Sequence, residues 1–539
     1  MRKCAIFAAV FFSISAAFMC SSCFARGGED PFARKWFLAN EIDFKASDKE
    51  CARLETLLGT AREAGYNGVM ISSWLGLDVL HTPIWTPERK ERLMRIKRRC
   101  DDLGLEIGVC VWTFGYARQG FFKIDQNLSA AAPVFDTRYR VEDGRCIHLP
   151  RPTSNLVESN SATIHAPHIP SDVPDFNISV TPRRSYRIRI KASASGVAGG
   201  WPFTVAVRRS CAKSDYIEHR IFKPKADGTE RTYEVLFSSL AETNVTIECR
   251  SYNRNYPGRA MLSSVELSET EPLLVVRRSG TPVRVRRVRD WKVLKEGVDF
   301  AKIPKATTLW PGSNTKLVLK PIKGGAMKDG DEISVDCFCS FPAWGRWTSA
   351  CMASPELFKE MEASAAEIAR TINPKVWELS FDEVRQGGGC LDCRKVGDMA
   401  HIYARCVKKA MSIIRKHRPD AEIFIYNDMV DPYYMKDEGR YAGLYSPMKG
   451  VWDLLPRDLG IDCWTHSTRE KAPKFFSDLG HPIFISAFHD EKELKNSAQW
   501  RDVALKTPGV KGVIYSTYSG NWSFLKPFAE LMKKPADVQ

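Results

Sequence analysis

The sequence lacks several features that would define its class at once. Beyond residues 1–25, no apolar run approaches the length of a transmembrane helix. No glycine-rich phosphate loop, nucleophile elbow or dinucleotide fingerprint is present, which predicts that the protein binds no organic cofactor. Internal repeats and low-complexity segments are also missing. Since no nucleic-acid-binding motif occurs either, we expect no nucleic-acid partner.

The N-terminus has the pattern of an export signal. Residues 1–25 begin with two basic residues, continue through an apolar run and end in small residues, as secretory signal peptides do. We therefore expect a secreted or periplasmic protein with no transmembrane segment. Cys23 follows two serines in a loose lipidation pattern, so a lipid anchor at the cell surface, on Cys20 or Cys23, is the alternative.

The number of cysteines limits the possible disulfides, and the net charge limits the possible partners. Of the 16 cysteines, Cys4, Cys20 and Cys23 belong to the signal, and the odd number that remains leaves at least one thiol without an internal partner. Much of the formal net charge of +15 lies between Arg277 and Arg289, where Val and Arg alternate as on a half-exposed strand. A solvated basic face is the simpler interpretation, and an anionic or sulfated glycan partner is the alternative.

The length and the periodicity predict a (β/α)₈ TIM barrel with an insertion. A chain of 539 residues exceeds one hydrophobic core. Apolar strands alternate with amphipathic helices, and this order implies a parallel sheet. Asp331–Ser340 would be a ninth strand, so we assign it to the excursion after the third strand, which leaves the eight that a closed barrel needs. The predicted barrel strands are Trp36–Phe44, Gly68–Ser72, Leu105–Trp112, Val376–Phe381, Ala421–Tyr426, Gly460–Trp464, Pro482–Ala487 and Val510–Ser516.

The insertion is expected to be a β-sandwich of the jelly-roll kind. Between residues 134 and 304 the helical periods disappear, and short alternating runs such as Tyr186–Lys191 follow one another. A sandwich in this place would either bind carbohydrate or brace the barrel. The expected division is a signal peptide at 1–25, barrel at 26–133, sandwich at 134–304, and barrel with the catalytic residues at 305–539.

Polar and aromatic residues gather at the predicted C-terminal ends of the strands, where barrels of this kind build their active sites. Asp382 and Glu383 end the fourth strand side by side, and strand alternation sends their side chains in different directions. One could then protonate a leaving group while the other orients a reacting group. Flat aromatic faces suit the C–H side of a sugar ring, and carboxylates accept its hydroxyls. The predicted substrate-binding residues are Trp74, Trp112, Tyr426, Asn427, Asp428, Trp464, Tyr515 and Trp522; His489 and Tyr518 also lie at strand ends.

The segment Glu378–Val384 resembles the fourth-strand motif of glycoside hydrolase family 20, the β-N-acetylhexosaminidases, which reads His-x-Gly-Gly-Asp-Glu. The segment around Asn427-Asp428-Met429 is similar to the fifth-strand segment of the same family. A second resemblance, to a group of exported bacterial barrel proteins with an inserted sandwich, rests on Cys351-Met352 through Asp382–Arg385, then Cys390–Cys393, then Tyr515–Tyr518. Glu378, Ser380 and Phe381 depart from the family's His, Gly and Gly.

This resemblance implies a glycoside hydrolase with substrate-assisted retention, in which the acetamido oxygen of the sugar attacks its own anomeric carbon. Asp382 would orient and stabilise the acetamido nitrogen, and Glu383 would protonate the leaving oxygen. Among the predicted aromatic residues, a tyrosine would hydrogen-bond the acetamido group and a tryptophan would stack on the sugar ring.

Other functions fit the same residues. A conventional retaining glycosidase would use Glu383 as the acid and Asp428 as a nucleophile about 5 Å away. A non-catalytic glycan-binding protein would keep the barrel as a scaffold. An ion-paired loop near Arg385 or Arg394 would explain the adjacent carboxylates with no chemistry at all.

A Cys-x-x-Cys pair follows the catalytic candidates. Cys390 and Cys393 have the spacing of half a zinc knuckle, but no second pair follows them. In an exported protein we therefore expect a local disulfide or a loop staple here, and no metal site.

Overall fold

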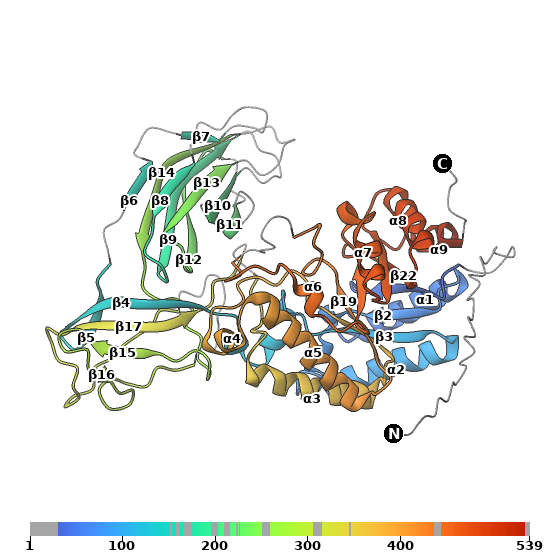
Figure 1. The fold of residues 1–539 in the computed structure, drawn as a ribbon, viewed down its shortest axis with the longest axis horizontal. Helices are drawn as coiled ribbons and strands as arrows, with labels where there is room; N and C mark the ends of the chain where they lie inside the picture. The colour runs from blue at the N-terminus through green and yellow to red at the C-terminus, as the bar shows by residue number, and fades with distance from the viewer. Residues whose placement is uncertain are drawn as a thin grey trace, which may run out of the picture.

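The computed structural model describes residues 31–533, apart from 151–153, 158–161, 165–174, 196–202, 210–215, 223–224, 226, 251–258, 306–314, 344–346 and 436–442. Its main unit is a closed barrel of eight parallel strands, which confirms the predicted (β/α)₈ fold (Figure 1). The barrel strands, in order around the barrel, are β1 (Arg34–Ala39), β2 (Gly68–Ile71), β3 (Glu106–Val111), β18 (Val376–Leu379), β19 (Glu422–Tyr426), β20 (Gly460–Cys463), β21 (Ile483–His489) and β22 (Val510–Ser516).

Helices surround the barrel because each has one apolar stripe to bury against the outside of the strands. Ser47 shows how one begins: its side chain accepts a hydrogen bond from the backbone N–H of Glu50 and caps the first turn. The apolar faces of these helices and the outward strand residues form one large buried cluster. The helices are α1 (Asp48–Glu63), α2 (Pro87–Leu103), α3 (Pro355–Thr371), α4 (Leu391–Val396), α5 (Met399–His417), α6 (Val451–Leu454), α7 (Ala472–Asp478), α8 (Lys495–Lys506) and α9 (Leu525–Lys533).

The inside of the barrel is filled by a second, smaller cluster. Trp36 on β1 is fully buried at its base, beside Met70 and Phe484. Gly68 gives the Trp36 ring its place, because a Cβ at residue 68 would lie 2.3 Å from the indole nitrogen. The same ring would lie 2.5 Å from a Cβ at Gly108. These large side chains fill the barrel interior at the N-terminal ends of the strands. A cavity is therefore expected at the C-terminal ends of the strands.

The excursion between β3 and β18 contains a β-sandwich. One sheet has the strand order β11-β10-β13-β8, and the other has the order β12-β9-β14-β6, with β7 paired to β14. The sandwich leans on the barrel loop that follows β19, since the N–H of Gly443 donates to the carbonyl of Tyr216 at 2.9 Å. The sandwich strands are β6 (Ser154–Val157), β7 (Ala162–Ile164), β8 (Phe176–Ser179), β9 (Ser185–Ser195), β10 (Phe203–Arg209), β11 (Tyr216–Phe222), β12 (Arg231–Ser238), β13 (Asn244–Arg250) and β14 (Arg259–Glu269).

A further five-stranded antiparallel sheet lies beside the sandwich (Figure 1). Its order is β16-β15-β17-β4-β5, and β17 pairs with β4 over seven residue pairs that include Val335 with Thr137. The assignment of Asp331–Ser340 to the excursion is therefore confirmed. The sequence did not separate this sheet from the sandwich. Its strands are β4 (Ala132–Glu142), β5 (Arg145–His148), β15 (Arg284–Arg287), β16 (Val293–Leu294) and β17 (Glu332–Cys339).

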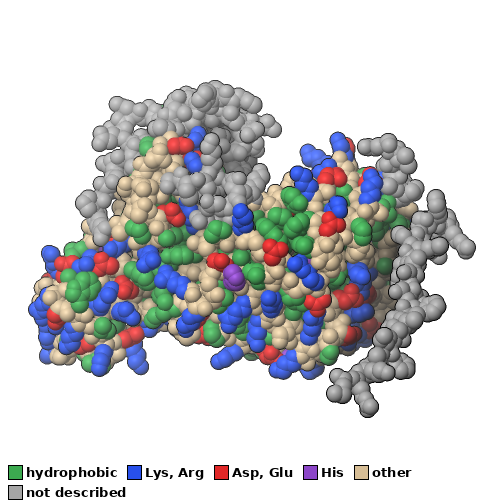
Figure 2. Space-filling model, in the orientation of Figure 1, with side chains coloured by type: hydrophobic (Ala, Val, Ile, Leu, Met, Phe, Trp, Pro, Cys, Tyr) green, Lys and Arg blue, Asp and Glu red, His purple; other side chains and the backbone are tan. Residues whose placement is uncertain are grey.

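The basic stretch between residues 277 and 289 belongs to this sheet. Arg286 forms an ion pair with Asp336 at 2.6 Å, and Arg287 forms one with Asp290 at 2.5 Å. Figure 2 shows Lys and Arg side chains interspersed with Asp and Glu over the described surface that it displays. The arrangement agrees with the solvated basic face that alternation predicted.

The predicted export signal lies outside the described residues, whereas the membrane and cysteine predictions concern residues within them. Residues 1–25 lie outside them, so the export signal and the lipid anchor stay predictions. No helix within the described ranges has the length and apolarity to cross a bilayer. Each cysteine of these ranges is a free thiol.

Candidate active site

A cavity of about 280 Å³ opens at the C-terminal ends of the barrel strands. Alternation along β18 and the residues after it places acidic side chains on the inside of the barrel. Trp377 and Leu379 pack outward against the helices. Glu378, Ser380 and Asp382 face inward. Both predicted catalytic residues, Asp382 and Glu383, line the cavity. Its full lining is Leu38, Ser72, Ser73, Trp74, Cys110, Tyr116, Ser380, Asp382, Glu383, Tyr426, Trp464, Ser486, His489, Ser516 and Tyr518.

The Glu383 carboxylate is held by two partners. Its Oε2 accepts a hydrogen bond from the Tyr116 hydroxyl and lies 2.5 Å from the Nη2 of Arg385. Arg385 is fully buried, and its guanidinium also stands 5.1 Å from the centre of the Tyr116 ring. The hydroxyl and the guanidinium together fix the orientation of the Glu383 carboxylate. Glu383 is thus set up as an oriented carboxylate that keeps 17% of its side chain exposed.

Asp382 has a different environment. Its Oδ1 accepts a hydrogen bond of 2.8 Å from the Ser380 hydroxyl. Burial raises the pKa of the Asp382 carboxyl above its ordinary value, although the Ser380 hydrogen bond and the charge of Arg385 act in the opposite direction. Two adjacent carboxyl groups with such different surroundings are suited to different proton-transfer roles.

The backbone between them adopts an unusual conformation. Glu383 has a φ of +47°, in the left-handed region that side chains other than glycine seldom occupy. The Glu383 N–H donates to the Oδ2 of Asp428 at 2.8 Å, which fixes the turn. Gly115 from the loop after β3 packs directly on this turn, because a Cβ there would lie 2.2 Å from the Asp382 carbonyl oxygen. Strained backbone of this kind is typical of functional sites.

A continuous series of rings forms the wall of the cavity. Trp74 lies in the middle, with its ring centre 5.7 Å from that of Tyr116 and 6.3 Å from that of Tyr518. Tyr518 continues to His489 at 5.0 Å, and His489 stacks on Trp464 at 5.7 Å with an interplanar angle of 21°. Burial lowers the pKa of His489. A cavity with flat aromatic faces and two carboxyl groups suits a ligand with both C–H faces and hydroxyl groups, as a sugar has.

Further acid groups lie buried around the cavity. Burial raises the pKa of Glu378 well above its ordinary value, and nearby Asp462 and Asp382 raise it further. Burial also raises the pKa of Asp462 to about 7, although its carboxylate accepts two hydrogen bonds from Ser486. The pKa of Asp428 is raised well above the ordinary value by burial and then by Asp382. The field of several acids close together opposes the ionisation of each one.

The structure brings together only part of the predicted binding set. Trp74, Tyr426 and Trp464 line the cavity with the two carboxyl groups. The other five residues are not part of its lining: Trp112, Asn427, Asp428 and Tyr515 are buried, and Trp522 packs against the outer core.

Two of these buried residues have visible supporting contacts. The Oδ1 of Asn427 accepts from the N–H of Trp464 at 3.1 Å and thereby positions that ring at the end of β20. Tyr515 points away from the cavity, stacks on Phe488 at 4.2 Å and donates its hydroxyl to the Asn521 carbonyl. Such residues hold the strand ends in place without reaching the cavity.

Tyr116 was missed as a site residue by the sequence. It lies in the loop after β3, whereas the sequence-based prediction concerns strand ends. The sequence cue was Gly115 directly before it, since glycine permits close approach of the loop to β18. Arg385 was considered only as an alternative explanation of the carboxylates, and the Glu383–Arg385 ion pair is indeed present.

Several solved structures are similar to parts of this chain. No family model matches the chain, and no curated protein matches it. A β-N-acetylhexosaminidase is similar at 12% identity, with a TM-score of 0.25, over 36% of this chain and 45% of its own. A β-D-glucuronidase from Dictyoglomus thermophilum is similar at 9% identity, with a TM-score of 0.22, over 76% of this chain and 97% of its own.

An endo-1,4-β-D-xylanase 10B from Clostridium thermocellum is similar at 12% identity over 72% of this chain and 90% of its own, with a TM-score of 0.19. This chain spans less than half of the hexosaminidase chain named above. At such identities and TM-scores, the likenesses carry no information about activity.

Proposed function

We propose that the protein is an exported glycoside hydrolase that removes a terminal sugar in the manner of a β-N-acetylhexosaminidase. The observation that carries this proposal is the convergence of Asp382 and Glu383 on one cavity with an aromatic wall. Pockets for small ligands have volumes of roughly 300–1,000 Å³. The cavity of about 280 Å³ is slightly smaller than this range, which favours one sugar ring over a threaded chain.

In the proposed reaction, the acetamido oxygen of the bound sugar forms a bond to the anomeric carbon while the bond from that carbon to the leaving oxygen breaks. An acid of the protein gives its proton to the leaving oxygen. Water then opens the cyclic intermediate and returns a proton to the same residue. The family resemblance assigns the acid to Glu383 and the acetamido partner to Asp382.

The contacts favour the exchange of these two roles. Burial raises the pKa of Asp382, so its carboxyl keeps a proton more readily than an ordinary aspartate. Glu383 forms an ion pair with the buried guanidinium of Arg385, so its side chain is oriented by a fixed partner. In this second assignment, Asp382 is the acid and Glu383 the partner of the acetamido group.

Asp428 has less support as a nucleophile. Its carboxylate is fully buried, and one oxygen is occupied by the backbone N–H of Glu383. We therefore treat it as a positioning residue for the Asp382–Glu383 turn rather than as a group that touches the sugar.

The test uses pairs of glycosides that differ in one feature each. One pair has or lacks the 2-acetamido group, and the other has a strongly acidic or a weakly acidic leaving group. Wild type should turn over the acetamido sugars alone. A variant without its general acid should lose roughly 10²- to 10⁴-fold on the weakly acidic leaving group and little on the strongly acidic one. Loss of the acetamido partner should instead slow both substrates.

Asp382→Asn and Glu383→Gln are the variants to compare, and the one with the selective loss identifies the acid. Turnover of sugars that lack the acetamido group would contradict the substrate-assisted reaction and favour a conventional retaining glycosidase. Full activity of both variants would overturn the proposal as a whole. Affinity for glycans without turnover, kept in Glu383→Gln, would show a non-catalytic glycan-binding protein.

A further inference from the structure

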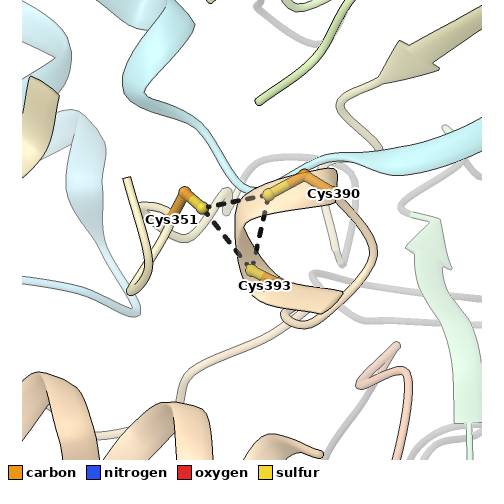
Figure 3. A group of neighbouring side chains, drawn as sticks. All are labelled: Cys351, Cys390 and Cys393. Atoms are coloured by element: carbon orange, nitrogen blue, oxygen red, sulfur yellow. Dashed lines mark hydrogen bonds between the residues drawn. The ribbon is translucent and has the colours of Figure 1, made fainter. Parts of the chain in front are cut away.

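Three cysteine thiols meet in the interior, next to the loop that leaves the active site. Cys390 and Cys393 stand at the start of α4, and Cys351 comes from the loop before α3 (Figure 3). Their exposed fractions are 1–2%, so solvent does not reach the group. The third thiol lies 39 residues before Cys390, so the spacing of the Cys-x-x-Cys pair gives no sign of it.

The helix start explains why two of the thiols point the same way. Cys390 is the N-cap residue of α4, and Cys393 lies three residues later. Residues three apart in the first turn project from one face. Cys351 faces them from the other side of the gap between α4 and the loop before α3 (Figure 3).

The distances among the sulfurs form a nearly regular triangle. Cys351 lies 3.5 Å from Cys390 and 3.7 Å from Cys393, and Cys390 lies 3.5 Å from Cys393. A zinc ion with Zn–S bonds of about 2.3 Å holds tetrahedral sulfur ligands about 3.8 Å apart. The three thiols therefore have nearly the dimensions of one face of a zinc tetrahedron.

We propose that Cys351, Cys390 and Cys393 bind one Zn²⁺ ion as thiolates. Binding releases the thiol protons, and the complex of Zn²⁺ with three thiolates has a net charge of −1. The guanidinium of Arg278 supplies the opposite charge, because it interacts electrostatically with all three sulfurs. A hydrogen bond of 3.2 Å from Arg278 to the Ser129 carbonyl holds it in place. Buried charge of this kind is stable only when it is balanced.

A small cavity beside two of the three thiols offers space for a fourth ligand. A cavity of about 10 Å³ borders Cys351 and Cys393 together with Met352 and Met399. Such a volume holds about one water molecule. The described residues offer three metal-binding atoms within 4.8 Å of one another here, all of them cysteine sulfurs, and thiolates select soft ions such as Zn²⁺.

The ion would tie together two loops that support the candidate active site. One loop runs from Glu383 through Gly387–Gly389 to Cys390. The other contains Ser349, whose hydroxyl accepts the N–H of Arg385 at 2.7 Å, and ends at Cys351. The zinc site is thus separate from the sugar cavity, and the proposal does not depend on the proposed glycosidase activity.

The experiment measures metal in the full chain purified without chelators. Mass spectrometry of the metal content should find one zinc per chain. Replacement by Co²⁺ should give thiolate-to-cobalt charge-transfer absorption together with the visible bands of a tetrahedral ion. Cys390→Ser should lower zinc affinity by more than about 100-fold, since the loss of a mere outer-shell partner costs roughly 10- to 100-fold.

The matched control is Cys337→Ala. Cys337 is buried and has one other thiol, Cys339, at 3.8 Å, but it is outside the three-cysteine group. This variant should keep its zinc. A chelator should lower the unfolding temperature of wild type and of Cys337→Ala but not of Cys390→Ser.

Three results on wild type overturn the proposal even if the variants fail to fold. Wild type without metal and with two thiols fewer than expected after unfolding, mapped to this group by peptide mass spectrometry, would show a disulfide among Cys351, Cys390 and Cys393. Wild type without metal and with all its thiols titratable would show simple thiol packing. A stoichiometric metal other than zinc would overturn the assignment of the ion.

Discussion

Replacing Asp462 with asparagine should make the barrel more stable at neutral pH. Asp462 is 1% exposed at the end of β20, and burial raises its pKa to about 7. An unfolded aspartate has a pKa of about 3.9, and one pKa unit corresponds to about 1.4 kcal/mol. Ionisation of this one side chain in the folded protein therefore costs about 4 kcal/mol at pH 8.

The sign of the pH dependence follows from proton binding. Between pH 4 and pH 7 the folded chain keeps the Asp462 proton that the unfolded chain has lost, so the free energy of unfolding falls as the pH rises. The stability contributed by the protonated side chain is complete below pH 4 and is lost through pH 7. An asparagine at this position cannot ionise, and its side-chain oxygen can still accept the N–H of Ser486 as Asp462 does at 3.0 Å.

Urea unfolding at several pH values, followed by tryptophan fluorescence, measures this difference. Asp462→Asn should match wild type, or lose about 1 kcal/mol, at pH 4 and gain roughly 3–4 kcal/mol over it at pH 8. The control is Asp478→Asn, because Asp478 is exposed and pairs with Lys474 at 2.7 Å. Its effect should stay below about 1 kcal/mol at both pH values. A constant difference between Asp462→Asn and wild type across this range would refute the reasoning.

Three further predictions concern the site and the excursion. Gly115→Ala should destabilise by more than about 1–3 kcal/mol in urea unfolding, since its Cβ would meet the Asp382 carbonyl at 2.2 Å; unchanged stability would contradict that packing. Trp74→Ala should raise KM more than it lowers kcat on the acetamido glycoside, because Trp74 is the centre of the aromatic wall; a selective loss of kcat would contradict this. Residues 154–269, which contain the sandwich strands β6 to β14, should melt cooperatively by circular dichroism when expressed alone, and an unfolded product would show that the sandwich needs the rest of the chain.

The parts that the sequence predicted are those set by local periodicity. Each barrel strand is a short apolar run between helices, so its position follows from residues close in sequence. The carboxylates at the end of β18 were predictable for the same reason, because a strand end in a barrel already defines a place in the site.

The parts that it did not predict depend on contacts between distant segments. The sheet around β17 joins strands from both ends of the excursion, and single alternating runs do not specify which of two sheets they enter. Tyr116 reaches Glu383 from a loop 267 residues away in sequence. Tyr515 lies on a barrel strand as predicted, but its side chain faces outward, since successive strand residues alternate and the neighbouring Ile514 and Ser516 face inward.

The position of the insertion within the barrel bears on the order of folding. β3 pairs with β18 although residues 112–375 lie between them, and β1 cannot meet β22 until the chain is complete. The entropy of joining such distant segments grows slowly, by about 0.6 kcal/mol per doubling of the loop. A folded insertion would shorten the effective loop and bring the ends of β3 and β18 within reach. During synthesis, β3 has an unpaired edge until β18 has been made. Unpaired strand edges of this kind promote aggregation.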